Sequence, residues 1–210
     1  MNEQQTAGPR SRAHRSGRPA PAPLRDGAEF LRGFLRNPAQ VGSVVPSSPF
    51  LERRLVRNAH IAEAHSVVEL GPGTGGTTAA LLHGMPAAGR LLAVELDPDF
   101  HRHVADTIHD PRLVLQLGSA EHLADFLAAH GMAAPDAIVS GIPFSTMPPA
   151  VSRRVAQAIA EVLRPGGRFV AYQVRAHVDG FVTPELGEPL QREWEMLNVP
   201  PVRVFTWQKR

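Results

Sequence analysis

From residue 66 to residue 76 the chain reads Ser-Val-Val-Glu-Leu-Gly-Pro-Gly-Thr-Gly-Gly. The segment predicts a short apolar strand over 66–70, a glycine-rich turn, and a helix that begins near residue 77. Because Gly71, Gly73 and Gly75 have no side chains, the backbone of such a turn can lie against a nucleotide-sized ligand. Glycine turns are common, so a second signal is needed before the turn can be assigned to a ligand.

Strands and helices alternate on the carboxyl side of this turn. Four further strands are predicted at 90–96, 113–117, 137–140 and 168–174, and helices at 77–83, 100–108, 121–129 and 149–163. Strands separated by helices of about ten residues imply right-handed crossovers and a doubly wound, mostly parallel sheet. Residues 193–197 and 203–207 predict a terminal antiparallel pair, which completes seven strands of an α/β fold. On the amino side, Ser48 is expected to cap a helix over 49–58.

The first part of the chain differs in composition. Residues 1–24 are rich in Pro, Gly, Ser, Ala and Arg, and we expect a disordered basic tail. The folded domain is predicted over 25–210, beginning with a basic amphipathic helix at 26–36. Residues 1–57 carry ten Arg against four carboxylates, which favours an anionic surface as partner, either lipid or nucleic acid. Two roles of the helix stay open: contact with an anionic membrane, or packing on the core.

Composition narrows the class of protein. The chain has no cysteine, which excludes disulfides, thiolate nucleophiles and cysteine-based zinc sites. His101 and His103 stand two residues apart at a predicted helix start, on different faces, so no metal site is expected. The segment 1–25 lacks the apolar core of a signal peptide, and no apolar run of about 18 residues occurs. We therefore expect a cytoplasmic protein, with peripheral contact at the inner membrane face as an open alternative.

Glu95 supplies the second signal for a ligand at the glycine turn. It closes the second predicted strand, where a carboxylate can accept hydrogen bonds from the two hydroxyls of a ribose. In an open α/β sheet the ligand lies beyond the carboxyl ends of the strands, next to the first strand–helix loop. The pair does not by itself distinguish a dinucleotide from S-adenosylmethionine, since both present an adenosine ribose.

The segment Glu69 to Gly75 resembles the E-x-G-x-G-x-G signature of class I methyltransferases, which have a Rossmann-like fold and use S-adenosylmethionine. Ser119 and Ala120 follow the third strand, where the family often has Gly-Asp-Ala; Ser119 in place of Asp leaves open whether it contacts adenine or only caps a helix. The cofactor-binding residues that the resemblance implies are Ser43, Glu69, Gly71, Gly73, Thr74, Gly75, Glu95, Leu96, Ser119, Ala120 and Ser140.

The fourth strand ends in Ser140-Gly141-Ile142-Pro143-Phe144. Methyltransferases that act on exocyclic amines of bases have an Asn at the position of Gly141, and that Asn holds the amine. Its absence argues against a base as substrate, so nucleic acid is an unlikely partner. Ile142, Pro143 and Phe144 are predicted to line the acceptor cleft.

Three further segments resemble the bacterial phospholipid N-methyltransferases, which are related in fold to the rRNA adenine dimethyltransferases. They are Phe34–Leu35 with the loop to Pro46-Ser47-Ser48, Ser140-Gly141-Ile142-Pro143, and Asn198-Val199-Pro200-Pro201-Val202-Arg203-Val204. The similarity spans about residues 28–208. It implies that the loop from Ser43 to Ser48 covers the cofactor and that the helix at 26–36 lies in the membrane interface.

Candidates for catalysis are fewer. Tyr172, the one tyrosine of the chain, falls in the fifth strand beside Gln173, and its ring is expected to contact the acceptor or to stabilise a cation. Glu121 and Tyr172 are the candidates for a base. The leading hypothesis is N-methylation of a lipid headgroup amine such as phosphatidylethanolamine. The alternatives are methylation of a soluble small molecule and, with Gly141 against it, of adenine in rRNA.

Overall fold

The computed structural model describes residues 47–174 and 177–210. The predicted tail at 1–24, the helix at 26–36 and Ser43 lie outside the described residues. They stay predictions.

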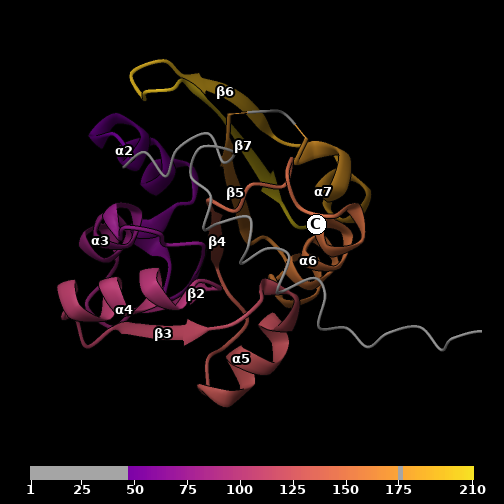
Figure 1. Cartoon of the computed structure of the whole chain (residues 1–210). Helices are drawn as coiled ribbons and strands as arrows, with labels where there is room; N and C mark the ends of the chain where they lie inside the picture. The colour runs from indigo at the N-terminus through magenta and orange to yellow at the C-terminus, as the bar shows by residue number, and fades with distance from the viewer. Residues whose placement is uncertain (1–46, 175–176) are drawn as a thin grey trace, which may run out of the picture.

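The centre of the fold is a seven-stranded sheet with the order β3-β2-β1-β4-β5-β7-β6 (Figure 1). Five strands are parallel, and β7 runs antiparallel to both β5 and β6. The doubly wound sheet with a terminal antiparallel pair is therefore confirmed. The strands are β1 Ser66–Leu70, β2 Arg90–Glu95, β3 Leu113–Leu117, β4 Ala137–Ser140, β5 Arg168–Gln173, β6 Gln191–Glu195 and β7 Val202–Gln208.

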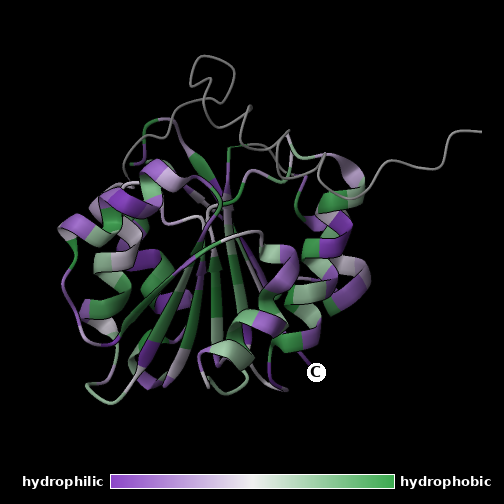
Figure 2. Ribbon diagram, turned by 60° about the horizontal axis from the view of Figure 1, so that its bottom comes forward, coloured by the Kyte–Doolittle hydropathy of each residue, from purple (hydrophilic) through white to green (hydrophobic). Residues whose placement is uncertain are grey.

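Helices cover both faces of the sheet. The helices α2 Pro49–Asn58, α3 Gly76–Gly84 and α4 Pro98–Thr107 lie on one side, and α5 Leu123–Ala129, α6 Pro149–Val162 and α7 Asp179–Leu186 on the other (Figure 1). Single turns of 3₁₀ helix occur at Ile61–Glu63 and Ala120–His122. Each face has its own apolar core, and Figure 2 shows hydrophobic strands enclosed between the two helical layers.

Local sequence explains most element ends. The Ser48 hydroxyl accepts the Leu51 N–H at 3.2 Å, so the predicted cap of α2 is confirmed. Helix α4 begins two residues earlier than predicted because Asp97 caps it through the N–H groups of Asp99 and Phe100. Strand β6 also lies earlier than predicted: it ends at Glu195, whose carboxylate then accepts the Leu197 N–H within the turn toward β7.

Helix α7 is absent from the prediction. Val178, Val182 and Leu186 recur at helical spacing and are all buried, but Gly180 and Pro184 between them obscure the pattern. Burial of these three side chains against the sheet outweighs the poor helix propensity of the other two. In the part of the chain that the structure describes, no helix is long and apolar enough to cross a membrane.

Candidate active site

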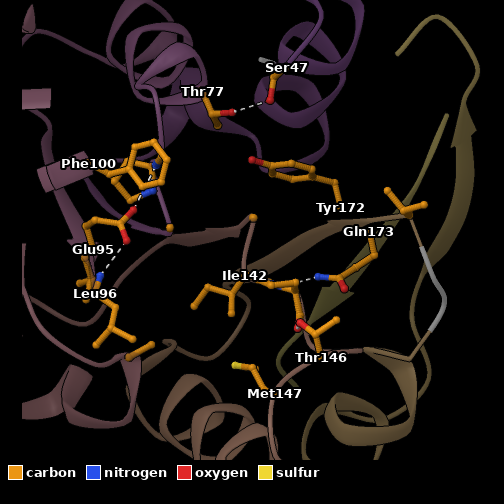
Figure 3. A pocket seen from close by; sticks show the side chains of 18 of the residues that line it. Ser47, Thr77, Glu95, Leu96, Phe100, Ile142, Thr146, Met147, Tyr172 and Gln173 are labelled. Carbon is orange, nitrogen blue, oxygen red and sulfur yellow. Dashed lines mark hydrogen bonds between the residues drawn. The ribbon is translucent and has the colours of Figure 1, made fainter. Parts of the chain in front are cut away.

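A cavity of about 400 Å³ opens at the carboxyl ends of the parallel strands. Its walls come from the turns after β1, β2, β3 and β4, the end of β5, the start of α2 and the segment before β7 (Figure 3). Ligand cavities in proteins measure roughly 300–1,000 Å³, so the space is of the size that binds a small molecule or cofactor.

The glycine turn forms one wall, but its glycines do different things. Gly71 and Gly73 have φ of +75° and +55°, a region that disfavours side chains, and both line the cavity together with Thr74. Gly75 does not line it. Its φ is +86°, and a Cβ there would lie 2.9 Å from Cδ1 of Ile108, so this glycine allows the turn to pack against the end of α4. The prediction that Gly75 faces the ligand is wrong.

Glu95 is buried at the cavity edge and is held by three backbone donors. Its Oε1 accepts the N–H groups of Leu96 at 2.8 Å and Asp97 at 2.9 Å, while its Oε2 accepts the N–H of Gly73 at 3.1 Å (Figure 3). Burial raises the pKa of the carboxyl, and the three N–H donors oppose that rise. The carboxylate is thus fixed in direction before any ligand binds.

Glu69 lies behind the glycine turn rather than in the cavity wall, contrary to the prediction of direct contact. Its Oε2 accepts the Thr78 hydroxyl at 2.6 Å, while its buried Oε1 has no hydrogen-bond partner among the described residues. Burial, reinforced by the charge of Glu95, raises the pKa of Glu69 to about 8, so the group is mostly neutral at pH 7.

An apolar slot follows Glu95. Leu96, Phe100, Gly118 and Ala120 line it, with Ser119 at its edge. The Ser119 hydroxyl accepts the Glu121 N–H at 3.3 Å, which makes it a cap of the turn Ala120–His122 while it still borders the cavity. Phe100 was missed from the sequence, although the Asp97 cap fixes the start of α4 and so the position of this ring.

Glu121 does not border the cavity. Its carboxylate forms an ion pair with Arg154 and accepts the Ser119 hydroxyl at 3.0 Å. A carboxylate held in this way outside the cavity is not placed to take a proton from an acceptor. The structure therefore contradicts Glu121 as a catalytic base.

The turn after β4 divides its residues between cavity and core. Ile142 and Pro143, two of the residues expected to line the acceptor cleft, line the cavity, and so does Gly141, which was not among them. Ser140 and Phe144 do not: the Ser140 hydroxyl is fully buried and accepts the Ile142 N–H at 3.3 Å, and the Phe144 ring is buried with its centroid 6.3 Å from that of Phe181. Both predictions of ligand contact are wrong for the same reason, because the tight turn points these two side chains inward. Thr146 and Met147, further along, line the cavity instead.

Tyr172 occupies the space above Gly141. A Cβ on Gly141 would lie 2.5 Å from the Tyr172 hydroxyl oxygen and 2.9 Å from Cζ, so a residue with a side chain at 141 would have to displace the ring. Burial raises the pKa of Tyr172, which keeps the phenol protonated. Gln173 donates from Nε2 to the Ile142 carbonyl and ties β5 to the turn after β4 (Figure 3).

Two segments from opposite ends of the described chain close the site. The Ser47 and Thr77 hydroxyls are 3.2 Å apart, and the Ser48 N–H donates to Oδ1 of Asn198 at 2.9 Å. Asn198, Pro200 and Val202 also line the cavity. The Pro-Ser-Ser and Asn-x-Pro-Pro segments both resemble segments of the phospholipid N-methyltransferases, but the sequence did not indicate that they touch.

These features fit an adenosyl group without a pyrophosphate. The glycine backbone allows close approach, Glu95 offers ribose hydroxyls a fixed acceptor, and the slot at Leu96 and Phe100 is apolar. Among the residues that the structure describes, no Lys, Arg or His lines the cavity, so a diphosphate would meet no cationic side chain there. Fold and site together define a Rossmann-like protein that binds an adenosyl cofactor.

Comparison with known proteins identifies the family. Residues 67–167 match the family model described as a methyltransferase domain. Over 147 residues the chain is 32% identical to ornithine lipid N-methyltransferase of Singulisphaera acidiphila, an alignment that covers 70% of this chain and 77% of that relative. This chain belongs to the class I S-adenosylmethionine-dependent methyltransferases, and it is an enzyme that uses this cofactor.

The chain is also similar to methyltransferases that are named for other substrates. Ribosomal RNA small subunit methyltransferase A of Nocardia farcinica is 31% identical over 170 residues, which cover 80% of this chain and 54% of that protein. The chain thus spans about half the length of that relative. Among solved structures, the N-methyltransferase NodS of Bradyrhizobium japonicum aligns with a TM-score of 0.61 at 15% identity, covering 77% of this chain and 97% of NodS. That likeness concerns the fold alone.

Proposed function

We propose that this methyltransferase methylates the amine nitrogen of a membrane lipid headgroup. The observation that carries the proposal is the 32% identity, over 77% of its length, to a relative named for N-methylation of ornithine lipid. The resemblance of residues 140–143 and 198–204 to phospholipid N-methyltransferases supports the same class of acceptor. Phosphatidylethanolamine and ornithine lipid both carry a primary amine, so both are candidates.

The acceptor side of the cavity supports this choice. Ile142, Pro143, Met147, Val151 and Val155 line it with apolar surface, which suits the uncharged form of an amine better than a polar base edge. Gly141 has no side-chain amide with which to hold a base, and the Tyr172 ring takes up the room above it. This argues against the adenine acceptor that the ribosomal RNA relatives suggest.

The cofactor contacts are assigned by the same geometry. In our proposal Gly71, Gly73 and Thr74 contact the cofactor along the turn, Glu95 accepts hydrogen bonds from its ribose, and Leu96 with Ala120 contacts its base. Phe100 joins this set because its ring lines the same slot. Ser119 borders the slot and is free to contribute its hydroxyl only beside its capping role.

The chain's own residues need to do little chemistry. When bound, S-adenosylmethionine supplies a methyl group already activated on a sulfonium, so the protein has mainly to orient the amine and exclude water. Tyr172 is proposed to hold the neutral nitrogen through its hydroxyl and, with its ring face, to stabilise the positive charge that the nitrogen gains on methylation. Apart from Glu95, no carboxylate of the described residues lines the cavity. The amine then arrives unprotonated, and the rate should rise with pH toward the pKa of an alkyl amine, roughly 10.

Transfer of radiolabelled methyl from S-adenosylmethionine tests the proposal. Parallel reactions contain vesicles with phosphatidylethanolamine, vesicles with ornithine lipid, free ethanolamine and ornithine, and ribosomal RNA, each with Glu95→Ala as the control. Label in the lipid fraction, lost in the variant, supports the proposal and tells the two lipids apart. Label only in a soluble amine or only in RNA would refute the lipid acceptor and leave the methyltransferase class intact.

A further inference from the structure

The turn between β6 and β7 presents apolar side chains to solvent. Met196, Leu197 and Val199 are 65%, 59% and 76% exposed, the highest values among the large apolar residues of the described chain. Single exposed apolar residues are ordinary, but three within four positions at the end of a hairpin are not. We call Met196, Leu197 and Val199 the apolar tip.

The apolar tip borders the mouth of the active-site cavity. Asn198 and Pro200, which alternate with it along the turn, line the cavity, whereas the three tip residues do not. The Asn198 side chain is bonded to the first turn of α2 through the Ser48 N–H. Figure 1 shows the β6–β7 turn extending beyond α2 at the end of the sheet that carries the site. Whatever the tip contacts therefore lies next to the cavity opening.

Aromatic rings with cationic partners lie on the two elements that meet at Asn198, helix α2 and the β6–β7 hairpin. The guanidinium of Arg53 lies 4.8 Å from the ring centroid of half-exposed Phe50, and that of Arg203 lies 4.5 Å from the centroid of half-exposed Trp194. Within the described ranges, neither Arg53 nor Arg203 forms an ion pair with a carboxylate, although Arg53 lies close enough to Glu195 to help lower the pKa of that carboxyl. The acidic groups of β6, Glu193 and Glu195, are neutralised by Arg54, and Glu193 also pairs with Arg57 at 3.6 Å.

An apolar point surrounded by tryptophan, phenylalanine and unpaired arginine matches the layers of a lipid surface. Apolar side chains suit the acyl region, amphipathic aromatic rings suit the headgroup level, and Arg suits anionic phosphates. A second copy of this chain that docked through the same surface would instead bring its own Arg53 and Arg203 close to these two residues, and the like charges would repel. The charge pattern therefore favours an anionic bilayer over self-association.

We infer that the apolar tip inserts into the interface of an anionic lipid bilayer, with Arg53 and Arg203 at the headgroups, and so sets the cavity mouth against the membrane. The role of this insertion in bringing lipid to the cavity rests on the proposed function. Insertion itself can be measured without any methyl transfer.

The absence of cysteine from the chain allows a direct test. Val199→Cys in the full chain is labelled with an environment-sensitive fluorophore and mixed with vesicles of equal parts phosphatidylcholine and phosphatidylglycerol. Leu190→Cys is the matched control, because Leu190 is 55% exposed but pairs with Thr206 toward the opposite end of the hairpin. We expect a blue shift at 199 that salt weakens, and none at 190. Equal shifts at both sites, or no shift at 199, would overturn the inference, as would a shift that grows with protein concentration without vesicles.

A second variant separates docking from catalysis. The triple substitution Met196→Ser, Leu197→Ser and Val199→Ser should weaken partition to the same vesicles by roughly tenfold or more, while Leu190→Ser changes it by less than twofold. If the proposed function holds, the triple variant should keep its rate on a short-chain lipid amine dispersed as monomers and lose rate on the same headgroup in vesicles. Unchanged partition would refute the docking site. If the triple variant loses partition as expected but the wild type methylates no lipid, only the lipid acceptor is refuted and the docking site stands.

Discussion

The two halves of the cavity are built by different means. The cofactor half uses the turns after β1 and β2, where backbone N–H groups converge on Glu95 and where Glu69 lies buried behind the turn. The acceptor half uses apolar side chains and one phenol from segments far apart in sequence, such as Ile142, Tyr172 and Pro200. One half is fixed by hydrogen bonds to carboxylates and the other by packing between distant strands.

This difference assigns each half a separate response to mutation. A buried carboxylate couples the cofactor half to pH and to the affinity for a charged ligand, because its protonation and its partners change together. The acceptor half has no such group among its described residues, so its substitutions should change turnover through shape. Substitutions in each half therefore show whether the two responses are separate.

The largest effect is expected from Glu69→Gln on stability against pH. The folded protein keeps a proton on Glu69 up to a pKa of about 8, while the unfolded chain releases it near 4.5. Stability of the wild type should therefore fall, relative to Glu69→Gln, as pH rises from about 5 to 8, by up to on the order of 4 kcal/mol. Urea unfolding of the cofactor-free protein at a series of pH values measures this gap. Two parallel profiles would show that Glu69 is not buried as a neutral acid.

Glu95→Gln should have the next largest effect, on the cofactor. The substitution removes the negative charge. It also puts an amide N–H₂ in place of one of the two carboxylate oxygens that accept backbone N–H groups in the wild type. Affinity for S-adenosylhomocysteine should fall by about 100-fold, which corresponds to about 3 kcal/mol. Titration calorimetry measures it, with Glu121→Gln as the matched carboxylate control, since Glu121 lies outside the cavity. A similar loss in both variants would mean that Glu95 acts only through general stability.

The third prediction concerns the acceptor half of the cavity, which Gly141→Ala changes. The new Cβ must push the Tyr172 ring from its place, because it would otherwise lie 2.5 Å from the hydroxyl oxygen. Methyl transfer should fall by at least about tenfold, while affinity for S-adenosylhomocysteine stays within about threefold. Gly180→Ala is the control, because a Cβ there meets no atom within 4 Å. Loss of cofactor affinity equal to the loss of turnover would show that the halves are not independent.

The same contrast explains what the sequence predicted. Strands β1, β3 and β4 were placed to the residue because each is an apolar run with clear breaks. Gly71 and Gly73 were found because they lie in the turn after β1, and Glu95 because it ends β2. The cofactor half is thus mostly local in sequence. The two residues predicted wrongly in this half are Glu69 and Gly75, and in both cases the sequence did not show to which side of the turn the residue points.

The acceptor half depends on contacts that no local pattern contains. Met147 and Asn198 reach the cavity through the packing of α6 on the sheet and of the β6–β7 turn on α2, and neither was predicted. Phe144 was placed in the cleft and lies in the core, because the tight turn after β4 directs its side chain away from the cavity. Tyr172 was correctly placed near the cavity, but its fit over Gly141 required the tertiary structure.

Tyr172→Phe should have the smallest effect and sharpens the role of the acceptor half. The variant keeps the ring and removes the hydroxyl, so kcat/KM for the lipid amine should fall about fivefold, roughly 1 kcal/mol. Tyr172→Leu should lose about tenfold more, because the ring face that attracts a cation is gone. Since burial raises the pKa of Tyr172, its phenol stays protonated at neutral pH, and the pH–rate profile of the Phe variant should match that of the wild type up to about pH 9. A profile that changes shape in this range would instead identify the hydroxyl as a proton acceptor, and the acceptor half would then rely on acid–base chemistry as well as on shape.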